Sequence, residues 1–135
     1  MKNKTYGSIR VDNGMRYIEV NDQGETIGIS IEDATFYEKY NSFVKWLHEQ
    51  NEEHQRATEE DHVFEFMAKF GRELSEKVDN IFGAGSSKKI FGDTTPSVYM
   101  AHDFFEQVTP IMEQIGKDRV KELKKKYSPD RKGNV

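Results

Sequence analysis

A heptad spacing of apolar residues within positions 60–82 constrains the fold of this chain more than any other feature. Successive members are three, four, three, four and three residues apart, so they fall on one face of a helix. A face of this length needs a second helix against it, and the glycine within it would let another backbone approach closely. The pattern therefore predicts a helical bundle. Its members are Phe64, Met67, Gly71, Leu74, Val78 and Ile81.

The first 31 residues predict antiparallel strands instead. Apolar and polar residues alternate in residues 17–20 and 26–31, with a turn at Gly24 between them. A further strand through Ile9 and Val11, before a turn at residues 12–14, would complete a three-stranded meander over residues 6–31. A sheet this small is marginal in water, so helices must cover its apolar face. That face would carry Ile18, Val20, Ile27, Ile29 and Ile31.

Three helices are predicted, over about residues 34–50, 60–82 and 96–127. Asp33 is the expected N-cap of the first, and Thr95, followed by Pro96, that of the third. Pro110 should kink or split the third helix. Residues 48–61 have no large apolar side chain and form either a polar linker or a solvated helical extension. Trp46 lies off the apolar stripe of the first helix.

The predicted fold class is therefore α+β, with a small antiparallel meander or hairpin followed by a bundle of three or four helices. Residues 1–127 would form one domain and residues 128–135 a disordered tail. Only 35% of the chain is hydrophobic and 33% is charged, which fits a core completed by a partner. The chain has no cysteine and no apolar run long enough to span a membrane, which suits a cytoplasmic protein.

A repeated Ile-Phe-Gly tripeptide, at residues 81–83 and 90–92, flanks a small basic segment. A phosphate-binding loop would need a second glycine directly before the lysine, Ser or Thr after it, and a strand in front. The segment lacks all three. We therefore expect an interhelical loop in which Gly83 takes the left-handed conformation after the helix and Phe82 and Phe91 anchor both ends.

Catalytic and metal-binding patterns are weak. His48 and His54 are six residues apart, which is the wrong spacing for a zinc-binding helix. No nucleophile array is visible, so we expect a non-enzymatic protein without cofactor or metal. The residues expected to anchor the core or bind a partner are Phe64, Phe70, Phe82, Phe91, Phe104 and Phe105.

Charge is uneven along the chain. The net charge is −4, but residues 117–132 hold eight basic and three acidic residues, an excess of +5 that leaves −9 for the remainder. This basic segment is either a solvated helix end or a surface for nucleic acid or an acidic partner.

Residues 18–115 resemble the tail assembly chaperones of long-tailed phages and prophages. The resemblance is carried by the helix end "ELSEKVDNIFG", the second Phe-Gly in "KIFGD", the closing helix, and Asp33 with Phe36 at the start of an earlier helix. After the second glycine the chain departs from the family pattern, and only Tyr99 and Ala101 echo it.

The resemblance implies a protein that coats the tape measure protein and helps to recruit major tail protein. It also implies self-association, location in the cytoplasm of the bacterial host, and absence from the mature virion. The alternative is a nucleic-acid-associated or regulatory phage protein that acts through the basic C-terminal helix.

Overall fold

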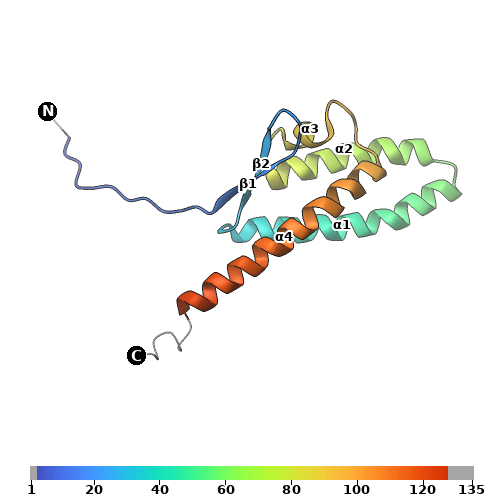
Figure 1. Ribbon diagram of the computed structural model, residues 1–135. Coiled ribbons are helices and arrows are strands. Elements are labelled where there is room, and N and C mark those ends of the chain that lie inside the picture. Colours follow the sequence, from blue (N-terminus) through green and yellow to red (C-terminus); the bar gives the residue numbers. More distant parts are fainter. Residues whose placement is uncertain (1–2, 128–135) are drawn as a thin grey trace.

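The structure is a computed structural model that describes residues 3–127. It has an antiparallel hairpin, β1 (Met15–Glu19) and β2 (Thr26–Ser30), followed by four helices. The helices are α1 (Ala34–Glu59), α2 (Val63–Phe82), α3 (Ser86–Phe91) and α4 (Val98–Tyr127). Figure 1 shows α1 and α2 as a long antiparallel pair, with the hairpin and α3 near one end and the last turns of α4 projecting beyond the body. The α+β class is confirmed; the tail at 128–135 lies outside the described residues.

The hairpin packs its apolar side against the helices. Ile18 pairs with Ile27, and Ile27 and Ile29 are almost completely buried. The turn is stabilised by Asn21, whose side-chain oxygen accepts hydrogen bonds from the N–H groups of Gln23 and Glu25. The expected third strand is absent, because residues 3–14 contain no strand and Ile9 and Val11 are exposed to solvent. The meander is thus a two-stranded hairpin.

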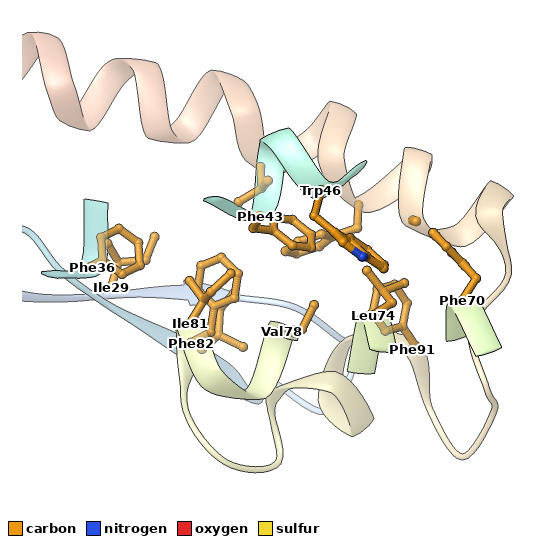
Figure 2. Close-up of a cluster of buried hydrophobic side chains, with 14 of the residues drawn as sticks. Ile29, Phe36, Phe43, Trp46, Phe70, Leu74, Val78, Ile81, Phe82 and Phe91 are labelled. Carbon is orange, nitrogen blue, oxygen red and sulfur yellow. The ribbon is translucent and has the colours of Figure 1, made fainter. Parts of the chain in front are cut away.

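The core lies between α1 and α2 and continues under the hairpin and α4. Figure 2 shows Phe43 and Trp46 of α1 facing Leu74 and Val78 of α2. The rings of Trp46 and Phe70 stack at 5.3 Å with an interplanar angle of 10°. Trp46 is therefore a core residue, and its placement off the stripe was wrong. Spacing alone predicts a buried face on α1 that is too narrow, because a large, flat side chain such as that of Trp46 can reach α2 from beside the stripe.

Two helix boundaries follow the sequence signals closely. The Asp33 carboxylate accepts a hydrogen bond from the Thr35 N–H at 2.9 Å, as expected of the N-cap of α1. Helix α1 then continues to Glu59, so the polar segment left open by the sequence is a solvated helical extension. Helix α2 ends at Phe82, where Gly83 has a φ of 112° and a ψ of 152°. Gly83 is thus not left-handed; Gly85 takes that conformation two residues later.

Helix α4 differs from its expected form at its N-cap. Ser97, and not Thr95, caps it, because the Ser97 hydroxyl accepts a hydrogen bond from the Met100 N–H at 3.2 Å. Pro110 does not split the helix, which runs unbroken from Val98 to Tyr127. Beside it, the Thr109 hydroxyl donates to the Phe105 carbonyl at 2.7 Å. No helix in the described part of the chain is long and apolar enough to cross a membrane.

Candidate functional site

The six aromatic residues singled out by the sequence divide between core and surface. Phe70, Phe82, Phe91 and Phe104 are buried, and Phe105 is half-buried against them. The Phe104 ring lies between those of Phe82 and Phe91, with centroid distances of 5.8 and 5.9 Å and edge-to-face geometry. Phe64 stands apart, with 82% of its surface exposed. It cannot anchor the core and is left as a surface residue.

The sequence predicts a loop between the two Ile-Phe-Gly copies, but residues 86–91 form the short helix α3. The Asp79 carboxylate accepts a hydrogen bond from the Ser87 N–H at 2.8 Å, and the Ser87 hydroxyl meets that of Ser75 at 2.9 Å. A protein carboxylate therefore occupies the position that an anion would need at this helix start. The connection between α2 and α3, which we call the joint, is therefore structural and provides no phosphate-binding loop.

The joint is also tied to the hairpin. The Lys89 ammonium donates to the Thr26 carbonyl at 3.1 Å, and the Asn21 side chain donates to the Lys89 carbonyl at 3.1 Å. These contacts connect residues more than 60 positions apart in sequence. They hold α3 beside β2 and thereby fix the position of Ile90 and Phe91.

Hairpin, α3 and α4 enclose a groove of about 500 Å³, which we call the hairpin groove. Its apolar lining comes from all three elements. Ile111 is 36% exposed within it, and Met100 and Ile90 are half-buried. The groove is thus an open apolar surface continuous with the core. Its lining includes Ile18, Val20, Ile90, Met100, Phe104 and Ile111.

The rim of the hairpin groove is acidic. Glu19 and Asp22 line it from the hairpin and Asp103 from α4, and all three side chains are exposed. Three carboxylates around an apolar floor create a negative potential at the mouth. An apolar segment flanked by basic side chains has the matching chemistry.

A second hollow, of about 240 Å³, lies between α1, α2 and α4. His48, His54 and His102 line it, and all three are exposed. Within residues 3–127, no group of three or more His, Cys, Asp or Glu side chains is placed to hold a metal ion. The hollow therefore provides no metal site in the described part of the chain.

The basic segment near the C-terminus is only partly available for binding. The Nη2 atom of Arg119 donates to both carboxylate oxygens of Glu32, at 2.9 Å from Oε2, and Nη1 contacts Glu122. Lys124 and Lys125 lie exposed in the last turn of α4. Pairing of Arg119 with Glu32 reduces the positive charge that this helix could offer to nucleic acid.

Sequence reasoning missed the hairpin groove because its lining comes from three segments that are far apart in the chain, within residues 18–27, 90–91 and 100–111. Ile111 belongs to no motif, and Ile90 belongs to the second Ile-Phe-Gly copy, which indicates a packed loop and not an exposed groove. The available signal was Ile111, which follows Pro110 and falls beside the main apolar stripe of α4. The contacts between α3 and the hairpin, together with the packing of α4 into the core, bring these residues to one surface.

Comparisons with known proteins return a single kind of match. A model described as "Family of unknown function (DUF6673)" matches residues 23–134. That range spans β2 and all four helices. Neither the curated proteins nor the solved structures give a significant match.

Proposed function

We propose that this chain, which belongs to the DUF6673 family, is a non-enzymatic assembly chaperone that binds a helical segment of another protein. The observation that carries the proposal is the hairpin groove, which combines an apolar floor with an acidic rim. Amphipathic helices bind in such grooves through side chains spaced three or four residues apart. Acidic rims favour partners with basic flanks.

The tape measure protein of a long-tailed phage or prophage is the proposed partner. This identification rests on the resemblance of residues 18–115 to tail assembly chaperones. A long helical protein exposes apolar stripes until the tail tube closes around it, and a chaperone with apolar grooves and a charged outer surface would keep it in solution. Recruitment of the major tail protein, action in the host cytoplasm and absence from the finished virion belong to the same proposal.

Co-expression with the long coiled-coil protein encoded beside this chain tests the proposal. We expect a soluble complex on size-exclusion chromatography with light scattering, containing several copies of this chain per partner. Ile111→Glu places a charge in the hairpin groove at an exposed position and should abolish the complex. Val120→Glu is the matched control, because Val120 is 52% exposed on the same helix and does not line the groove.

Two results would overturn the proposal. In one, the partner stays insoluble while this chain elutes alone. In the other, Ile111→Glu binds as well as Val120→Glu, which would remove the groove from the interaction. Salt-sensitive retention of DNA or RNA that is lost on deleting residues 117–135 would favour the nucleic-acid alternative.

A further inference from the structure

Part of the outer edge of β1 presents backbone groups that pair with nothing in the described chain. At the start of that edge, Met15 is already satisfied, because its N–H donates to the Asn13 side-chain oxygen and its carbonyl accepts from Arg16. The Ile31 N–H donates to the Gly14 carbonyl and the Val20 N–H donates to the Glu25 carbonyl, each at 2.9 Å. In an antiparallel ladder, residues two apart face the same neighbour. Gly14 and Val20 show that the even-numbered residues of this strand direct their backbone groups toward β2. The N–H and C=O groups of the odd-numbered Tyr17 and Glu19 therefore point away from β2, and within residues 3–127 no hydrogen bond reaches them.

Residues 3–12 form an extended arm that leaves the body at the start of β1 (Figure 1). Its apolar side chains are highly exposed to solvent: Tyr6 is 93% exposed, Ile9 85% and Val11 82%. Ile9 and Val11 are two positions apart and would share one face of a strand. The arm thus has the composition of a strand without a neighbouring strand.

In the structure the arm does not fold back onto the β1 of its own chain. The Asn13 carbonyl accepts a hydrogen bond from the Ser30 hydroxyl at 2.9 Å, and the Gly14 carbonyl accepts one from the Ile31 N–H. Residues 13–14 therefore still run alongside β2. A tight reversal directly after Val11 would have to release these contacts, because it takes at least two loop residues and only Asp12 lies between Val11 and residues 13–14.

We propose that the arm pairs with the outer edge of β1 in a second copy of this chain, and that two copies exchange arms around a two-fold axis. Arm and β1 run in one direction, so a two-fold axis near residues 12–14 sets each arm antiparallel to the partner's β1. Ile9 and Val11 would then extend the apolar face that carries Ile18. The exchange satisfies the open edge and turns a marginal two-stranded hairpin into a continuous sheet.

Light scattering on the purified full chain tests the exchange independently of any tape measure partner. We expect twice the 15.7 kDa chain mass. Deletion of residues 3–11 should give the monomer mass with unchanged helical circular dichroism. Tyr17→Pro should do the same, because it removes only an outward N–H and leaves the ladder to β2 intact. Phe64→Ser, which changes an exposed apolar residue on α2, is the control and should remain dimeric.

Covalent trapping distinguishes exchange between copies from pairing within one copy. The chain has no cysteine, so Ser8→Cys with Tyr17→Cys introduces the only two thiols. A short bis-maleimide should yield dimers on a denaturing gel. A monomeric full chain, a dimer that survives deletion of the arm, or a crosslink confined to single chains would each overturn the proposal.

Discussion

At the scale of single residues, Gly71 determines how closely the segment before α4 approaches α2. A Cβ at this position would lie 2.3 Å from Cγ2 of Thr95 and 2.7 Å from the Pro96 carbonyl oxygen. Pro96 itself is fully buried. The close approach expected from the heptad spacing is real, but the neighbour is a segment without regular secondary structure and not a helix.

Gly71→Ala should therefore destabilise the protein although alanine favours helices by about 1 kcal/mol. Displacing the Pro96 backbone should outweigh that gain, leaving a net loss of about 1–3 kcal/mol in the free energy of unfolding. Urea denaturation followed by circular dichroism measures the difference. Gly116→Ala is the control: a Cβ there meets nothing within 4 Å, so a gain of up to about 1 kcal/mol is expected. Equal effects at the two positions would contradict the packing argument.

At the scale of elements, the ends of α1 and α2 show what local signals determine and what they leave open. Asp33 has the residue type and position of an N-cap, and the cap forms as expected. The start of α2 is different. Phe64 and Met67 continue the heptad spacing, yet both are exposed, because no other element within residues 3–127 covers that face of the first turns of α2. Spacing predicts a helical face but does not state how far a partner extends along it.

The cap on α1 makes stability depend on pH. Hydrogen bonds from the Thr35 hydroxyl and N–H lower the pKa of Asp33 below its usual 3.8. A carboxyl with a lowered folded-state pKa stabilises the fold above its unfolded pKa and loses that contribution as pH falls through the folded value. Asp33→Ala should thus lower the melting temperature at pH 7. The difference from the unmodified protein should shrink below pH 3.8, and a difference independent of pH would contradict the assignment.

The sequence alone could predict neither helix α3 nor the absence of the third strand. Six residues are too few to display a helical period, and α3 depends on the Asp79 carboxylate and the hairpin for its hydrogen bonds. The alternation of Ile9 and Val11 with polar residues is typical of a strand, but a strand also requires the edge of a neighbouring strand with which it can form hydrogen bonds. Such requirements are set by tertiary contacts, which a local pattern does not contain.

At the scale of the whole molecule, one aromatic cluster connects the helices. The ring centroid of Phe82 in α2 lies 6.0 Å from that of Phe36 in α1 and 5.8 Å from that of Phe104 in α4. Phe91 of α3 also packs its ring against Phe104. The sequence predicted these anchors because a chain with few hydrophobic residues must bury its aromatic side chains to form a core. The hairpin groove, assembled from three elements, had no equivalent signal.

Phe82→Ala and Phe91→Ala should each cost about 3–5 kcal/mol, because both side chains are buried and leave cavities. Phe64→Ala should change stability by no more than about 0.5 kcal/mol, since its side chain is 82% exposed. Thermal melts of the three variants check the ranking. Unchanged melts for the first two variants, with loss of partner binding, would move both residues from the core to the interface.

Trp46 gives the protein a natural optical probe. It is the sole tryptophan, stacked on Phe70 and Phe43, with the Lys77 ammonium 5.2 Å from its ring. Its emission should be blue-shifted in the folded state and shift to the red when α1 and α2 separate. No residue of α1 lines the hairpin groove, so a partner seated there should leave the signal unchanged. Intrinsic fluorescence will therefore follow unfolding without interference from binding, and partner titrations will need a dye attached elsewhere.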